Sequence, residues 1–140
     1  MILDYFNKQR RTNMAGFVGN IEELTLRNSF FRQVIFTGAH SQLVLMCLQP
    51  GEEIGEEVHD VDQFFRFEQG DEGKVIIDGV ESAVKDGMAV VIPAGAKHNV
   101  VNASATQQLK LYTIYSPAQH KDGTVHETKA QAIADETDHL

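Results

Sequence analysis

The feature that most constrains this chain is a short apolar stretch, bounded by turn residues, that recurs along the sequence. The stretches are mostly four to eight residues long, are rich in Val, Ile, Phe or Tyr, and are separated by glycines. They cover residues 30–36, 42–48, 63–67, 74–77, 88–92, 98–101 and 109–115. Stretches of this length are typical of strands, and their even spacing favours an antiparallel sandwich or barrel over a parallel sheet with crossover helices.

Local signals predict one hairpin and two short helices. Asp78-Gly79 lies between residues 74–77 and 80–84, and because both turn residues tolerate positive φ, a two-residue hairpin is expected. One short helix is expected near residues 21–25. A second is expected to begin at Thr128, where the sequence up to Gln131 has the form of a capping box, and to run to about residue 136.

A chain of 140 residues corresponds to one domain of ordinary size. We expect an amino-terminal arm over residues 1–28, a barrel over residues 29–117 and a carboxyl-terminal tail with a short helix over residues 118–140. Cys47 is the single cysteine, so no disulfide can form within the chain. No apolar run has the length of a membrane span or the form of a secretory signal, which predicts a cytoplasmic protein.

The charge balance limits the class of partner. A formal net charge of −8 at pH 7 disfavours nucleic acid and anionic membranes, because both carry the same sign as the protein. A small molecule or a cation fits better. Residues 90–92 and 111–115 are apolar on both faces of their predicted strands, so the second face needs a cover. We expect a homodimer to supply it; a helix or the amino-terminal arm lying over the sheet is the alternative.

Two groups of residues have the types that bind metals. Glu57 and His59 are two positions apart, so on an extended strand both side chains point to the same face, and Gln63 returns to that face if the connection is tight. The remaining acids between Glu52 and Glu72 are expected to form a solvated rim. In the second group, His98 begins a strand after a sharp turn, and alternation places it on one face with Val100 and Asn102.

Together these segments resemble the paired motifs of the cupin superfamily. The second motif is matched without a gap by Gly87, Pro93, Gly95, His98 and Asn102. The first is matched at the required spacing by Gly51, Glu57, His59, Gln63 and Gly70, with Glu57 where a His is usual and Gln63 where a Glu is usual. The resemblance spans about residues 42–116. It implies an all-β fold, a double-stranded β-helix or jelly-roll barrel, here with short flanking helices.

The resemblance also implies one divalent metal held by Glu57, His59, Gln63 and His98. The family's three His and one Glu carry one negative charge, and this set keeps that charge on Glu57. An amide oxygen is a weaker donor than a carboxylate, so Gln63 is expected to bind loosely or to orient a water, which leaves a two-His, one-carboxylate set suited to Fe, Mn, Ni, Co or Zn. The alternative is a pocket without metal, in which Glu57 faces solvent.

Other residues near the motifs have weaker signals. Phe65 and Phe67 share the parity of Gln63 and are expected to line the same cavity. Tyr112 and Tyr115 are candidate proton donors, although a structural role fits both. Four histidines outside the motifs are expected at the surface: His40, His120, His126 and His139.

Three classes of function stay open. The first is metal-assisted proton transfer on a small sugar-like or keto ligand, as in the isomerases among similar stand-alone cupins, with Glu57 as base if it is unligated. The second is an Fe(II)-dependent dioxygenase. The third is a non-catalytic barrel that binds or senses a small molecule. No Lys or Arg cluster is visible in the motif region, which favours neutral over heavily phosphorylated ligands.

Overall fold

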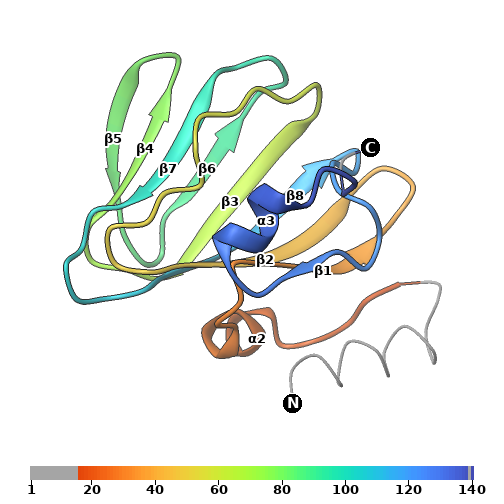
Figure 1. Ribbon diagram of the computed structural model, residues 1–140, viewed down its shortest axis with the longest axis horizontal. Coiled ribbons are helices and arrows are strands. Elements are labelled where there is room, and N and C mark those ends of the chain that lie inside the picture. The colour runs from red at the N-terminus through yellow and green to blue at the C-terminus, as the bar shows by residue number, and fades with distance from the viewer. Residues whose placement is uncertain (1–15, 139) are drawn as a thin grey trace.

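The protein is built from two antiparallel sheets with short helices outside them (Figure 1). The computed structural model describes residues 16–138 and 140. In Figure 1 the smaller sheet stands beside the long strands of the larger one, and α2 lies below β2 and β1. The expected all-β fold with short flanking helices is confirmed.

The larger sheet has the strand order β6-β3-β8-β2-β1-β9, and the smaller sheet has the order β5-β4-β7. The strands of the larger sheet are β1 (Arg32–Thr37), β2 (Gln42–Leu48), β3 (Asp62–Gln69), β6 (Ala89–Ile92), β8 (Leu109–Ser116) and β9 (Val125–His126). Those of the smaller sheet are β4 (Gly73–Ile77), β5 (Val80–Val84) and β7 (His98–Asn102), and the helices are α2 (Ile21–Arg27) and α3 (Lys129–Ala134). Each predicted apolar stretch therefore overlaps a strand.

The predicted hairpin joins β4 to β5. Ile77 pairs with Val80 across the turn, and the two residues between them, Asp78 and Gly79, have φ values of 48° and 83°. Both values lie in the left-handed region, which the tight turn between two twisted strands requires. The two-residue turn is confirmed, and it fixes the register of the smaller sheet.

An apolar core fills the space between the inner faces of the two sheets. Phe65 and Phe67 of β3 are almost completely buried there, with ring centroids 6.3 Å apart, and Val75 and Val100 reach the same core from the smaller sheet. Burying an aliphatic or aromatic side chain of this size stabilises the fold by about 1.5–3 kcal/mol. Gln63 lies on the same face at the start of β3, so the polar residues gather at one end of a core that is otherwise apolar.

Helix α2 covers part of the outer face of the larger sheet. Its Asn20 cap accepts a hydrogen bond from the Glu23 backbone N–H at 3.0 Å, and the buried Leu24 packs against Ile35 and Leu45. The alternative cover for this face, a helix lying over the sheet, is therefore present. The homodimer stays a prediction.

The carboxyl-terminal segment is tied to the larger sheet. Strand β9 pairs with β1, with Arg32 opposite His126 and Gln33 opposite Val125. Helix α3 begins after Thr128, whose side chain accepts a hydrogen bond from the Gln131 backbone N–H at 3.2 Å, as the capping sequence predicts. The helix ends at Ala134, slightly before the expected residue. The predicted boundaries at residues 28 and 117 stay a prediction.

Two of the four histidines expected at the surface are buried. His120 and His126 are 0% and 3% exposed, so their prediction is wrong. His120 Nδ1 lies 2.7 Å from Asp138 Oδ2, and His126 Nε2 lies 3.0 Å from Asp135 Oδ2. Both carboxylates belong to the carboxyl-terminal segment. Their hydrogen bonds to the two rings offset the cost of burying polar groups. His40 is exposed as expected, and His139 lies outside the described residues.

Candidate metal centre

Two segments far apart in the sequence meet at the centre. Glu57 and His59 lie in the connection between β2 and β3, and His98 is the first residue of β7. The connection is irregular where an extended strand was expected, because Gly51 and Gly55 take φ values of 79° and 109°. It nevertheless pairs with β7 at two bridges, Glu53 opposite Val101 and Glu57 opposite His98. The Glu57 N–H donates to the His98 carbonyl at 2.8 Å, and the His98 N–H donates to the Glu57 carbonyl at 2.9 Å.

The turn before β7 also holds the backbone of His59. The Gly95 N–H donates to the His59 carbonyl oxygen at 2.8 Å. Gly95 has a φ of 88°, a left-handed conformation that glycine adopts without a side-chain clash. The glycine of the second motif therefore positions both histidines: it turns the chain into His98 and it anchors His59.

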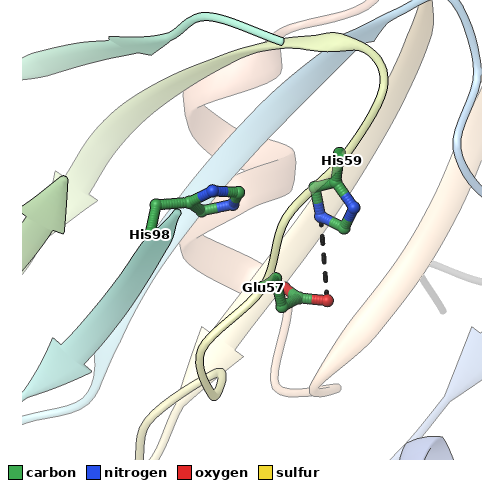
Figure 2. Close-up of side chains that lie close together, drawn as sticks. All are labelled: Glu57, His59 and His98. Carbon is green, nitrogen blue, oxygen red and sulfur yellow. Dashed lines mark ion pairs between the residues drawn. The ribbon is translucent and has the colours of Figure 1, made fainter. Parts of the chain in front are cut away.

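The side chains of Glu57, His59 and His98 converge (Figure 2). Each offers one ligand atom, and these atoms all lie within 4.8 Å of one another. The ring centroids of His59 and His98 are 5.2 Å apart, and His59 Nε2 lies 3.7 Å from Glu57 Oε2. Figure 2 shows the three side chains reaching from two segments of the chain toward a common space. The structure thus brings together three of the four residues that the sequence predicts as metal ligands.

The two imidazole rings fit a metal because each presents an unused nitrogen. Within the described part of the chain, Nε2 of His59 and Nε2 of His98 are buried and have no hydrogen-bond partner. His98 Nδ1 lies 3.0 Å from the Ala96 carbonyl oxygen, so Nδ1 carries the hydrogen and Nε2 keeps its lone pair. A buried polar atom without a partner costs about 1–3 kcal/mol. A divalent transition metal would bind both nitrogens and remove that cost.

Glu57 supplies the charge of the group. Burial raises the pKa of its carboxyl, but hydrogen bonding to His59 and electrostatic interactions with His59, Arg32 and His98 act in the opposite direction, and the net pKa is lowered. The carboxyl is therefore ionised at neutral pH. Its side chain is 26% exposed, against 6% for His59, so Glu57 lies on the solvent side of the group.

Gln63 also presents a free oxygen, although its role as a ligand stays a prediction. The residue is 3% exposed and lies opposite Tyr115 across β3 and β8. Its Nε2 donates to Thr113 Oγ1 at 3.0 Å, and its Oε1 has no hydrogen-bond partner among the described residues. Because the amide nitrogen is engaged, the oxygen is the atom left for a ligand.

The two tyrosines of β8 lie on opposite faces. Tyr115 is 1% exposed, and its ring meets the edge of His59 with centroids 5.8 Å apart. Tyr112 packs beside Leu45 and α2 on the outer face. The structure therefore does not bring Tyr112, the predicted proton donor, to the group. The reason is the alternation of side chains along a strand, which places residues an odd number apart on different faces.

Sequence reasoning missed three buried polar residues on the inner side of the larger sheet. His120 Nε2 lies 3.3 Å from the Tyr115 hydroxyl, and Asp138 binds the other nitrogen of that ring. Arg32 is 5% exposed and lies on the inner face of β1. One signal in the sequence could have identified Arg32: it is a charged residue inside the first apolar stretch, and it has the same strand parity as Val34. His120 and Asp138 had no such signal.

No helix of the described residues has the length and apolar character needed to cross a membrane.

Comparison with known proteins gives one consistent family. The sequence model of the cupin domain family matches residues 44–115. The Bacillus subtilis protein YrkC is 49% identical over 127 residues, which is 86% of this chain and 67% of that protein. A protein of Acanthamoeba polyphaga mimivirus is 45% identical over 121 residues, 83% of this chain and 74% of its own. The crystal structure of BH2720 from Bacillus halodurans is similar at a TM-score of 0.83 and 47% identity, covering 88% of this chain and 97% of that chain. The expected jelly-roll barrel is thereby confirmed, and the chain belongs to the cupin family.

Proposed function

We propose that this protein binds one divalent transition metal through Glu57, His59 and His98, with Gln63 as a fourth and weaker ligand, and uses it on a small polar molecule. One observation carries the proposal: a carboxylate oxygen and two imidazole nitrogens lie within 4.8 Å of one another, and both nitrogens are buried without a hydrogen-bond partner. A simple ion pair between Glu57 and His59 would not require His98 to lie within 4.8 Å of both. Here both rings point to the same space.

The chemistry proposed for this centre is proton transfer. A divalent metal held by these residues would polarise a carbonyl or hydroxyl oxygen, which would lower the cost of moving a proton on the adjacent carbon. Glu57 is the residue suited to take that proton when it is not bound to the metal, because its carboxyl is ionised at neutral pH and partly exposed, so the proton can be passed on to water. Tyr115 stays protonated beside the group, because burial raises its pKa.

The surrounding residues hold the reacting groups in place and exclude water. The Ala96 carbonyl fixes the ring of His98, and Gly95 anchors His59 through its backbone. The buried rings of Phe65 and Phe67 lie on the same face of β3 as Gln63. An apolar floor lowers the local dielectric, which strengthens the electrostatic interactions of the centre.

Metal content tests the binding proposal. Protein purified without chelator should contain a stoichiometric divalent metal by mass spectrometry, and His59→Ala and His98→Ala should each lose most of it. His40→Ala is the matched control, since His40 is exposed and outside the centre, and it should retain the metal. Equal metal content in all four proteins would contradict the proposal.

Hydrogen exchange at carbon tests the chemistry separately. Hydroxyacetone is incubated in deuterated water with the metal-loaded protein, and the loss of carbon-bound hydrogen next to the carbonyl is followed by proton NMR. We expect exchange that requires both the metal and Glu57. A protein that holds its metal but leaves the carbon-bound hydrogens unexchanged would support metal binding and contradict proton transfer.

The composition of the ligand set supports a second candidate function. Two histidines and one carboxylate are the set used by many non-haem Fe(II) oxygenases. If oxygen chemistry is the function, the iron-loaded protein should consume dioxygen in an oxygen electrode with a diketone or a small thiol as co-substrate. Oxygen consumption equal to that of His98→Ala would exclude this candidate for those substrates.

A further inference from the structure

Tyr115 contacts the ring of His59 from outside the proposed ligand set. It lies on β8, in the row of the larger sheet that places it opposite Gln63 of β3. The rings of Tyr115 and His59 meet edge to face, with centroids 5.8 Å apart and planes at 82°. Tyr115 is 1% exposed, so the contact is made inside the barrel. The orientation of Tyr115 therefore bears directly on a proposed metal ligand.

The two histidines of the centre are held in different ways. The backbone anchors the ring of His98, whose Nδ1 lies 3.0 Å from the Ala96 carbonyl oxygen. In the described part of the chain, no backbone group makes a hydrogen bond to the ring of His59. Apart from Glu57 and His98 of the centre itself, the ring that meets His59 is that of Tyr115. Tyr115 is thus placed to do for His59 what the Ala96 carbonyl does for His98.

A buried pair from the carboxyl-terminal segment holds the hydroxyl of Tyr115. His120 Nδ1 lies 2.7 Å from Asp138 Oδ2, and His120 Nε2 lies 3.3 Å from the Tyr115 hydroxyl. The side chains of His120 and Asp138 are 1% and 2% exposed. Because a carboxylate only accepts, Nδ1 carries the hydrogen of the first bond, and Nε2 is left for the hydroxyl. A chain of two hydrogen bonds therefore leads from Asp138 to Tyr115.

The backbone of this pair is also held. Gln42 lies opposite Tyr115 across β2 and β8. Its Nε2 donates to the His120 carbonyl at 2.7 Å, and its Oε1 accepts from the His120 N–H at 3.0 Å. The Lys121 N–H donates to the Asp138 carbonyl at 2.5 Å, which keeps the end of the chain beside His120. Both members of the pair are therefore fixed by backbone bonds, as a rigid support for Tyr115 requires.

We propose that Tyr115, held by His120 and Asp138, is a positioning residue of the metal centre. It fixes the ring of His59 in the orientation that binds the metal. The inference rests on the proposed function and gives the carboxyl-terminal segment, which lies outside both motifs, a role in metal binding. Residues that orient a metal ligand from outside the ligand set typically change metal affinity about 10–100-fold. Loss of the support should weaken metal binding although every proposed ligand remains.

The other buried histidine of the segment provides matched controls. His126 Nε2 lies 3.0 Å from Asp135 Oδ2, and His126 Nδ1 lies 3.3 Å from Arg32 Nη1. Arg32 is opposite Met46, which is four positions along β2 from Gln42. This pair therefore supports a different row of the larger sheet. Its removal perturbs the same segment without removing the support of the centre.

Cobalt binding tests the inference in the full-length protein. Competition with a fluorescent chelator measures the affinity, and the visible absorption of bound Co reports the geometry of its ligands. Asp138→Ala and His120→Gln should each weaken binding about tenfold or more and change the spectrum. Asp135→Ala and His126→Gln should leave both unchanged. Tyr115→Leu, which removes the ring, should weaken binding at least as much as Asp138→Ala.

A measurement without metal separates this inference from the proposed function. In EDTA, the ring C–H resonances of His59 are followed by proton–carbon NMR, because a neighbouring aromatic ring shifts the resonances of nearby nuclei. Asp138→Ala and His120→Gln should move these resonances, and the two control substitutions should not. If the wild type binds no metal but the resonances respond in this way, the proposed function fails while the support of His59 by Tyr115 stands.

Two results would overturn the inference. Tyr115→Phe removes only the hydroxyl, so it tests the support even if the Asp138 and His120 variants fail to fold. Unchanged Co affinity, Co spectrum and His59 resonances in Tyr115→Phe, and in whichever of the other two variants folds, would show that the buried pair only stabilises the fold. Equal losses of Co affinity in the control variants would show a general effect of the segment and not positioning by Tyr115.

Discussion

Glu57 and His98 lie directly opposite each other and exchange two backbone hydrogen bonds, of 2.8 and 2.9 Å. The bonds connect the irregular segment after β2 with the first residue of β7. Backbone hydrogen bonds therefore hold Glu57 and His98 next to each other, and no contact between their side chains is needed for this. Backbone pairing of this kind survives side-chain substitution. The centre can therefore be taken apart one ligand at a time without opening the barrel.

His98→Ala should separate metal binding from folding. The substitution removes a ligand but keeps both backbone bonds, so the variant should fold and should lose the increase in melting temperature that added Mn, Co or Ni gives the wild-type protein. In EDTA the variant should be about as stable as the wild type, because the buried unpartnered Nε2 is removed with the ring. Scanning calorimetry with and without metal measures both effects. An equal metal-induced shift in the two proteins would argue against His98 as a ligand.

Gln63→Glu should tighten metal binding and weaken the metal-free fold. A carboxylate is a stronger ligand than an amide oxygen, but it cannot donate to Thr113 Oγ1 as Gln63 Nε2 does at 3.0 Å. Competition against a fluorescent chelator measures the metal affinity, and urea unfolding in EDTA measures the stability. Gln63→Leu is the companion variant. If neither substitution changes the metal affinity, Gln63 is not a ligand.

The thiol of Cys47 should be unreactive in the native protein. Burial raises its pKa from 9.0 to about 11, so little thiolate is present at pH 8. Reaction with a disulfide reagent should be slow until the protein is unfolded in guanidinium. Because the folded pKa is the higher one, the unfolded state loses this proton first, and the contribution of Cys47 to stability should fall as the pH rises from 9.0 to about 11.

The difference in unfolding free energy between the wild type and Cys47→Ala isolates this effect from other groups that titrate in alkali. The difference should decline over that pH range. Rapid native labelling at pH 8, or a pH-independent difference, would show that the thiol is more accessible than its burial indicates.

Removal of the Asp138 carboxylate should destabilise the protein more than removal of Asp135. The His120–Asp138 pair is 2.7 Å long with both side chains at most 2% exposed, whereas Asp135 is 33% exposed. Breaking a buried pair leaves a polar ring without its partner, at a cost of about 3 kcal/mol or more, and a partly exposed pair is worth less. Urea unfolding of Asp138→Ala and Asp135→Ala gives the comparison. Equal losses of unfolding free energy in the two variants would mean that the buried pair stabilises the protein no more than the partly exposed one.

The strands and the three residues of the candidate metal centre could be predicted because their sequence signals are local or have fixed spacing. Residues 42–48 were predicted as a strand with the same ends as β2, and the turn at Asp78-Gly79 was identified from two residues. The spacing within the two motifs was enough to single out Glu57, His59 and His98, which lie close together in the structure. A fixed spacing within each motif reflects the backbone geometry that brings the side chains together.

The residues that sequence reasoning missed have partners elsewhere in the chain. His120 and Asp138 form a pair that no spacing rule predicts, and His126 is buried because β9 joins β1. Arg32 has no motif or spacing that marks it, and only its buried position in β1 shows that it points inward. Tyr112 was considered together with Tyr115 although alternation separates their faces. Long-range pairing decides the burial of His120, Asp138 and His126. Strand alternation, a local rule, decides the case of Tyr112.

The most direct test of the metal centre is an anomalous difference map from crystals of the protein loaded with Mn or Co. We predict one dominant peak at metal-ligand distance, about 2.0–2.2 Å, from a Glu57 carboxylate oxygen and from Nε2 of His59 and His98. A fully loaded crystal whose only peaks lie elsewhere, with the two imidazole nitrogens free of metal, would contradict the account.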